Sequence, residues 1–222
     1  MQRLNKIILR KVYVAHISRR QFLISSAALP LAALMPIPAL AASSVIHSLQ
    51  GTVTANKKPL TRDSVIKNGD EIIVSKDGKL VFSIGEDAFL VRAGSTLQVY
   101  AEENNVLVSA LRLVNGAVLG VFGKRKTTTR IYTATATIGI RGTAVYAAVT
   151  PQQLYTCTCY GHTDLIVGLE SADVIATHHN AHVVTNGHKG NAQMKAFEVI
   201  DHNDDELRML EALVGRKPVF DV

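Results

Sequence analysis

The feature that most constrains the fold is a run of short apolar segments that alternate with turn residues between Val45 and Phe122. The separators include Asp-Gly and Asn-Gly pairs, which favour tight hairpin turns. The run therefore predicts an all-β fold, an antiparallel β-sandwich or a β-roll of short hairpins. The predicted strands are residues 45–49, 52–55, 71–74, 79–84, 88–92, 96–101, 106–113 and 117–122, with Asn115-Gly116 as the last turn among them.

A longer segment follows in residues 131–145, Ile-Tyr-Thr-Ala-Thr-Ala-Thr-Ile-Gly-Ile-Arg-Gly-Thr-Ala-Val. Its threonines alternate with Tyr, Ala and Ile through residue 138, which is the period of a half-buried strand. Gly139 and Gly142 flank Arg141, and they predict a bend where the backbone turns sharply. We expect Arg141 to donate hydrogen bonds to the carbonyl groups of that bend.

The order of these signals resembles the FecR domain, a periplasmic all-β module known from iron-siderophore signalling. The most specific match is Thr-Ala-Thr-Ile-Gly-Ile-Arg-Gly-Thr at residues 135–143, so Gly139, Arg141 and Gly142 would be a fold signature. Weaker matches are Gly51-Thr-Val53, Pro59-Leu60, Asn68-Gly69-Asp70-Glu-Ile72, Asp77-Gly78 and Leu113-Val-Asn-Gly116-Ala-Val-Leu. The resemblance covers residues 46–148 and implies a sensing or binding role in the cell envelope.

Classical FecR regulators also contain a cytoplasmic anti-sigma segment, a transmembrane helix and a C-terminal domain that meets an outer-membrane receptor. In this sequence an export-type leader runs directly into the β-rich region. We therefore expect a stand-alone exported domain and do not transfer the anti-sigma role to it.

The leader, residues 1–41, carries six of the 24 lysines and arginines and no acid, so the remaining 18 bases match the 18 acids. Its apolar run ends in Ala39-Leu40-Ala41, the small-x-small pattern of a cleavage site. Ser18-Arg19-Arg20-Gln21-Phe22-Leu23 resembles the twin-arginine motif of the bacterial Tat route. These signals predict export to the periplasm, with no transmembrane segment in the mature chain. The alternative is a membrane anchor formed by an uncleaved signal.

Beyond the FecR-like region, residues 42–150, the composition changes. We expect residues 151–222 to form a β extension packed on the same domain, with hairpins at 154–160/163–169 and 174–177/181–185. A short C-terminal helix should start at Asn203 or Asp204, with Glu206 placed as in a capping box, and end at Gly215. Its apolar stripe favours packing against the sheet.

The candidate chemistry lies in this extension. Cys157 and Cys159 would face one side of a strand, because alternate residues share a face. Six of the eight histidines also follow residue 160, namely His162, His178, His179, His182, His188 and His202. Thiolate and imidazole are ligands of zinc and copper. Our candidate metal ligands are Cys157, Cys159, His162, His178 and His179.

Two other interpretations of the cysteines stay open. A Cys-x-Cys disulfide would suit an oxidising compartment, although its short loop is strained. Free buried thiols that pack as small apolar side chains are the second interpretation. The histidines themselves would then be solvated loop residues.

No enzymatic motif is present: the sequence has no Gly-x-Ser-x-Gly, phosphate loop, His-Glu-x-x-His or Cys-x-x-Cys-His. The basic cluster Lys124-Arg125-Lys126 with Arg130 is expected to be a solvated loop, and the neutral mature chain argues against nucleic-acid binding. We therefore predict a non-enzymatic binding or sensing module, whose partner is an envelope protein or a cell-envelope polymer. The alternative is a metal- or redox-active periplasmic protein that uses the Cys/His cluster.

Overall fold

The computed structural model describes residues 44–101, 107–185 and 193–222. Every described residue belongs to the second of the two units into which the chain divides, Ala39–Val222. The predicted export leader and His188 lie outside the described residues. No helix in the described part of the chain has the length and apolar character needed to cross a membrane.

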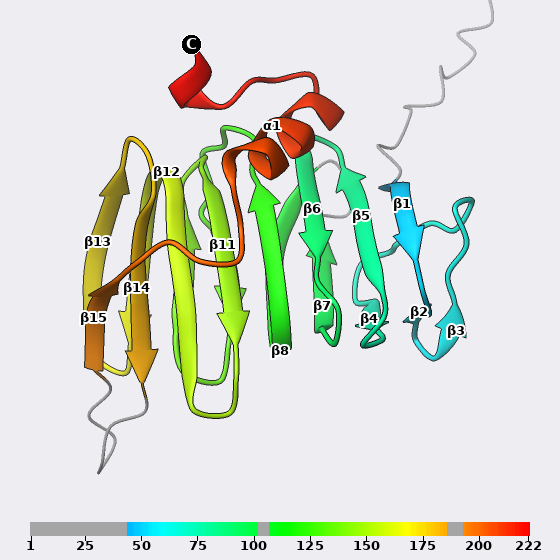
Figure 1. The fold of residues 1–222 in the computed structure, drawn as a ribbon, viewed down its shortest axis with the longest axis horizontal. Coiled ribbons are helices and arrows are strands. Elements are labelled where there is room, and N and C mark those ends of the chain that lie inside the picture. The colour runs from blue at the N-terminus through cyan, green and yellow to red at the C-terminus, as the bar shows by residue number, and fades with distance from the viewer. Residues whose placement is uncertain (1–43, 102–106, 186–192) are drawn as a thin grey trace, which may run out of the picture. The chain divides into compact units, whose positions relative to one another are not determined.

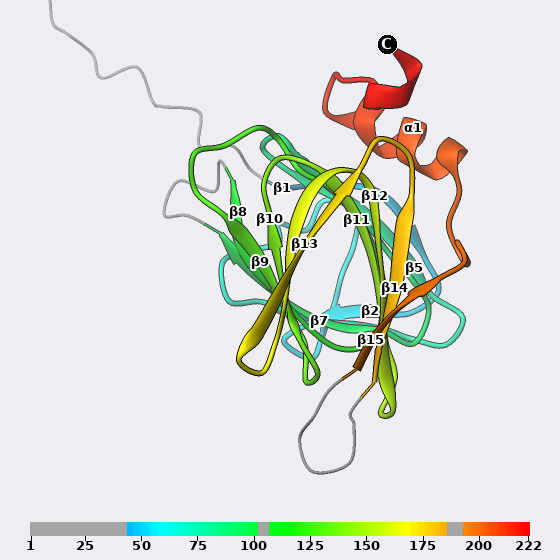
Figure 2. The same cartoon turned by 90° about the vertical axis from the view of Figure 1, so that its left-hand side faces the viewer.

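The second unit consists of two packed β-sheets and a short C-terminal helix, so the predicted all-β fold is confirmed (Figure 1, Figure 2). The strands of sheet A, in spatial order, are β1 (Ser44–Gln50), β5 (Lys79–Ile84), β6 (Asp87–Val91), β8 (Val108–Val121), β11 (Ala144–Val149), β12 (Gln153–Val167), β14 (Asn180–Thr185) and β15 (Gln193–Phe197). The strands of sheet B are β3 (Lys58–Pro59), β2 (Val53–Ala55), β4 (Glu71–Val74), β7 (Thr96–Ala101), β8, β9 (Thr129–Tyr132), β10 (Thr137–Ile140), β12 and β13 (Glu170–Ala176).

Strands β8 and β12 belong to both sheets. Residues 108–115 of β8 pair in sheet B and residues 116–121 in sheet A, while β12 changes sheets at Gly161. The predicted turns at Asn115-Gly116 and Gly161-His162 are therefore wrong, because each is a bend inside one continuous strand. Together β8, β11, β12, β10 and β9 close a ring between the sheets.

Both bends require glycine. Gly116 and Gly161 have φ of 81° and 89°, a left-handed conformation that other residues adopt at a cost. A Cβ at Gly116 would lie 2.5 Å from Ser95 Cα, and one at Gly161 would lie 2.7 Å from Thr143 Cβ. The absence of a side chain thus lets each strand turn from one sheet into the other.

The segment 131–145 differs from the single strand that we predicted. Strand β9 ends at Tyr132, and a tight turn follows in which Thr133 Oγ1 donates to Ala136 O at 2.8 Å. Strand β10 then contains Gly139, and the predicted bend is present at Gly142, which has φ of 68°. All four residues 133–136 are Thr or Ala, whose short side chains suit either a strand edge or a turn, so alternation alone does not reveal the turn.

Arg141 does not bond to carbonyl groups of the bend as predicted. Its Nε and Nη2 atoms both donate to Asp164 Oδ2, at 3.1 and 2.8 Å. Gly139 pairs directly with Asp164 across β10 and β12, so the aspartate lies beside the bend. The arginine is therefore attached to the neighbouring strand by an ion pair at the surface.

The predicted solvated basic loop is only partly correct. Lys124, Lys126 and Arg130 are exposed, but the Arg125 side chain is 3% exposed and forms a buried ion pair with Asp87. Arg125 also donates to Val108 O and Thr129 Oγ1, both at 2.7 Å. These bonds join the start of β8 to β9, beside the parallel β8–β9 pair.

The apolar side chains fill two layers. One lies between the sheets and includes Phe82, Phe89, Leu111 and Ile138. The other lies on the outer face of sheet A, where it is covered by the C-terminal segment and by helix α1 (Asp204–Leu213). The central strands of sheet A are therefore buried on both faces, which explains the apolar runs 80–82 of β5 and 88–91 of β6 and the unbroken burial of residues 154–160 in β12.

Helix α1 matches its prediction closely. Asn203 is the N-cap residue, and its side chain accepts a hydrogen bond from Glu206 N at 3.0 Å. Leu207 and Leu210 are fully buried against the outer face of sheet A. Gly215, with φ of 72°, follows the helix end. The Glu206 side chain does not return to the cap but pairs with Arg92.

Candidate metal centre

Cys157 and Cys159 lie on the part of β12 that belongs to sheet A, and both point to the outer face. Both are fully buried and neither forms a disulfide. The two thiols share a face because they are separated by one residue of a strand. They thus form one side of an enclosed site beneath the C-terminal segment.

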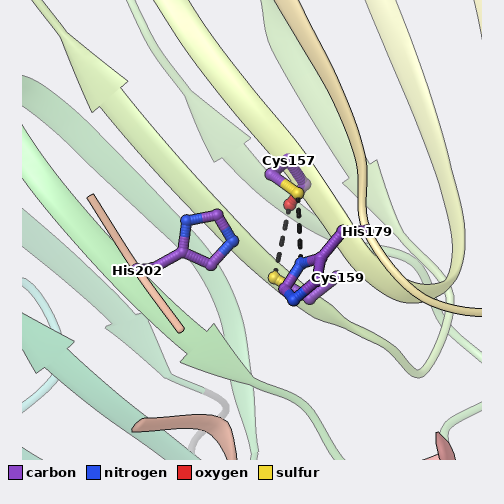
Figure 3. A group of neighbouring side chains, drawn as sticks. All are labelled: Cys157, Cys159, His179 and His202. Atoms are coloured by element: carbon purple, nitrogen blue, oxygen red, sulfur yellow. Dashed lines mark hydrogen bonds between the residues drawn. The ribbon is translucent and has the colours of Figure 1, made fainter. Parts of the chain in front are cut away.

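Two histidines from distant parts of the chain complete the cluster (Figure 3). His179 lies in the turn between β13 and β14, where its N–H donates to Cys159 O at 2.8 Å and its Nδ1 lies 3.6 Å from Cys157 Sγ. His202 lies in the segment that leads from β15 to α1. One ligand atom from each of the four residues lies within 4.8 Å of the others.

The tautomer of His202 follows from its surroundings. Its Nδ1 lies 2.8 Å from Ile200 O, and because a carbonyl oxygen only accepts, Nδ1 carries the proton. In the neutral ring its Nε2 then carries a lone pair, and this atom is buried without a hydrogen-bond partner among the described residues. The ring stacks on Tyr146 at 4.6 Å, which fixes its orientation. An unsatisfied buried acceptor costs about 1–3 kcal/mol, so this nitrogen needs a partner.

The tautomer of His179 is fixed in the same way. Its Nε2 lies 2.9 Å from Asp204 Oδ1 and donates to that carboxylate, which leaves the Nδ1 lone pair facing Cys157. Burial raises the pKa of Asp204, but hydrogen bonds from His178 and His179 outweigh it, so that the pKa lies below its ordinary value. In metal sites a carboxylate commonly accepts a hydrogen bond from the second nitrogen of a ligand histidine and thereby orients the ring.

The thiols are electrostatically unequal. A hydrogen bond from Cys159 is the largest cause of the lowered pKa of Cys157, and burial acts against it. Burial and the neighbouring Cys157 raise the pKa of Cys159. A divalent cation bound by both sulfur atoms would displace their protons and offset the charge of the two thiolates, which removes the cost of a buried charge.

The structure brings together three of the five candidate ligands, Cys157, Cys159 and His179. His162 lies elsewhere, on the part of β12 that belongs to sheet B, and its Nε2 atom lies 2.7 Å from Asp173 Oδ1. His178 turns outward beside His179 and contacts Asp204 at 3.0 Å. The separation of His162 follows from the bend at Gly161, which turns the strand after the cysteines into the other sheet.

His202 is the ligand candidate that we did not predict. It was one of six histidines after residue 160, and no spacing connects it to Cys157 or Cys159. Its position directly before the helix cap at Asn203 was the available signal, because an apolar helix stripe must return the chain to the sheet.

The donor set is two sulfur and two nitrogen atoms, which is the Cys2His2 set of structural zinc sites. With metal–ligand bonds of about 2.0–2.3 Å, ligand atoms of a tetrahedron lie about 3.3–3.8 Å apart, so a small contraction of the cluster would suffice. Four protein ligands leave no position for a substrate. The geometry suits a structural metal.

No family model matches the chain, and no curated protein matches it. Two crystal structures of a protein described as a "putative anti-sigma factor" from Parabacteroides distasonis ATCC 8503, at 2.50 and 1.65 Å resolution, are similar with 11% sequence identity and a TM-score of 0.49. The match covers 58% of this chain and 60% of that one, and at this level it assigns neither a family nor a function.

Proposed function

We propose that this chain is an exported, non-enzymatic binding module of the cell envelope whose C-terminal part is built around a Cys2His2 zinc centre. The observation that supports a bound metal is the arrangement of the two imidazoles. Each has one nitrogen bonded to an oxygen acceptor, Asp204 or Ile200 O, and each leaves its lone-pair nitrogen in a cluster with two buried thiols.

Zinc suits the donor set better than other metals. Thiolate and imidazole favour zinc or copper over magnesium or calcium, and four closed ligands suit a structural zinc. The burial of both thiols and the lack of an open coordination position favour a binding module over the redox-active alternative. The envelope location and a binding partner there, a protein or an envelope polymer, rest on the leader and on the FecR-like motifs of the sequence.

Metal analysis of the purified chain tests this function. Protein prepared with reductant and without chelator should contain about one equivalent of zinc per chain, and a Cys157→Ser, Cys159→Ser double variant should contain almost none. His162→Gln is the matched control and should keep its zinc, since His162 lies outside the cluster. Less than about half an equivalent in the wild type, or unchanged metal in the double variant, would contradict the proposal.

A further inference from the structure

We propose that the metal acts as a latch: its binding holds residues 198–222, the C-terminal cover, over the outer face of sheet A, and its loss releases the cover. The latch rests on the proposed metal centre, whose occupancy would control the position of the cover. That position is measured separately from metal binding.

The cover runs from the end of β15 across the outer face of sheet A to α1 and ends at Val222 (Figure 1). It supplies one ligand, His202, to a cluster whose other members belong to β12 and to the β13–β14 turn. A metal bound by all four residues would therefore tie the cover to the sheet. No other ligand of the Cys2His2 set comes from the cover.

The other attachments of the cover lie on both sides of His202. They include hydrogen bonds from His178 and His179 to Asp204, from the buried Tyr160 hydroxyl to Glu211 and from Arg216 to Glu86 O. Before His202, the Tyr155 hydroxyl donates to Glu198 O at 3.2 Å and accepts from Ile200 N at 3.1 Å. After it, Arg92 forms a bidentate pair with Glu206 at 2.6 and 2.7 Å, with both side chains about a fifth to a quarter exposed. Ion pairs that reach solvent stabilise only weakly.

A few apolar side chains also hold the cover on the sheet. In α1 only Leu207 and Leu210 are fully buried among the apolar side chains, although Ile200, Leu213 and Phe220 pack in part. They cover an outer face that contains Val81, Leu90, Leu119 and Tyr146. Release of the cover would therefore expose an apolar surface at the centre of sheet A.

The chemistry of the donor set favours release when no metal is bound. The cover then buries the two thiols and the His202 Nε2 atom, which has no hydrogen-bond partner among the described residues. Water satisfies these groups as soon as it reaches them, and it reaches them when the cover lifts. With the metal bound, these groups become ligands and the closed arrangement loses this penalty. Occupancy thus shifts the equilibrium toward the covered state.

Hydrogen–deuterium exchange of the full chain tests the latch, with zinc-loaded protein compared with protein treated with reductant and a zinc chelator. We expect chelation to speed exchange in peptides from residues 198–222 by at least about tenfold, while peptides from β4 and β7 of sheet B stay unchanged. Glu206→Gln is the control variant, because it weakens the hold on α1 without removing a ligand. It should speed exchange of α1 in both metal states and keep its zinc.

The outcomes separate the latch from the metal centre. If zinc binds at about one equivalent but exchange of residues 198–222 is the same with and without it, the latch is wrong and the metal centre stands. If zinc does not bind, both proposals are wrong. If chelation speeds exchange equally in β4 and β7, the metal stabilises the whole domain and not the cover, and the latch is again overturned.

Discussion

His179 and His202 show how single residues define this site. Each imidazole has one nitrogen bonded to an oxygen, and the other is available in a cluster with the thiols. The strand period predicted that Cys157 and Cys159 share a face. Which histidines join them depends on how the turn between β13 and β14 and the segment after β15 pack on β12. The only local signal for either is the helix cap at Asn203, directly after His202.

The buried ion pair Asp87–Arg125 leads to a second prediction about single residues. Asp87 accepts from Val108 N at 2.9 Å and Gly123 N at 3.0 Å, and it is fully buried. Asp87→Asn leaves the Arg125 charge without its partner, so we expect a loss of about 3–5 kcal/mol in the free energy of unfolding. Urea denaturation measures it.

The exposed pair Arg208–Asp221 is the matched control for that change. Asp221→Asn should leave the denaturation midpoint almost unchanged, because water already solvates both groups. Similar shifts for the two variants would show that the burial of Asp87 does not contribute as argued.

At the scale of elements, the strands were largely predictable and their connections were not. Predicted strands 71–74, 79–84 and 96–101 coincide with β4, β5 and β7. The glycines of β8 and β12 predict hairpin turns, but a left-handed glycine suits a turn and a bend equally. The partner strands decide between them, and those partners are distant in sequence. For the same reason 174–177 and 181–185 were paired with each other, whereas β13 and β14 each pair with β12.

Two glycines allow the energetic cost of an unfavourable backbone conformation to be distinguished from the cost of steric crowding. Gly142 and Gly161 both have positive φ, but an added Cβ at Gly142 would lie 3.4 Å from Lys124 Cα and one at Gly161 2.7 Å from Thr143 Cβ. We expect Gly142→Ala to cost about 1–2 kcal/mol, from conformation alone. Gly161→Ala adds a clash at the bend of β12 and should cost about 2–5 kcal/mol.

Thermal denaturation of the two alanine variants checks this order. The melting temperature should fall further for Gly161→Ala than for Gly142→Ala. Equal decreases would mean that the contact with Thr143 relaxes freely and that the bend does not depend on the missing side chain.

At the scale of the whole domain, the burial of the central strands of sheet A on both faces connects the fold to the site. One face forms the core with sheet B, and the other lies beneath the C-terminal cover, where the metal ligands gather. The motifs singled out in residues 46–148 lie in the β framework, whereas the ligands of the cluster all follow residue 150. The module proposed here is thus a β framework with a metal-held cover.

The proposed zinc centre requires that two sulfur and two nitrogen atoms bind one zinc ion in this cluster. X-ray absorption at the zinc edge of the chain as purified measures those bonds directly. We predict two sulfur neighbours at about 2.3 Å and two imidazole nitrogen neighbours at about 2.0–2.1 Å. A zinc ion with only oxygen and nitrogen neighbours, or protein free of zinc, would contradict the proposed Cys2His2 zinc centre.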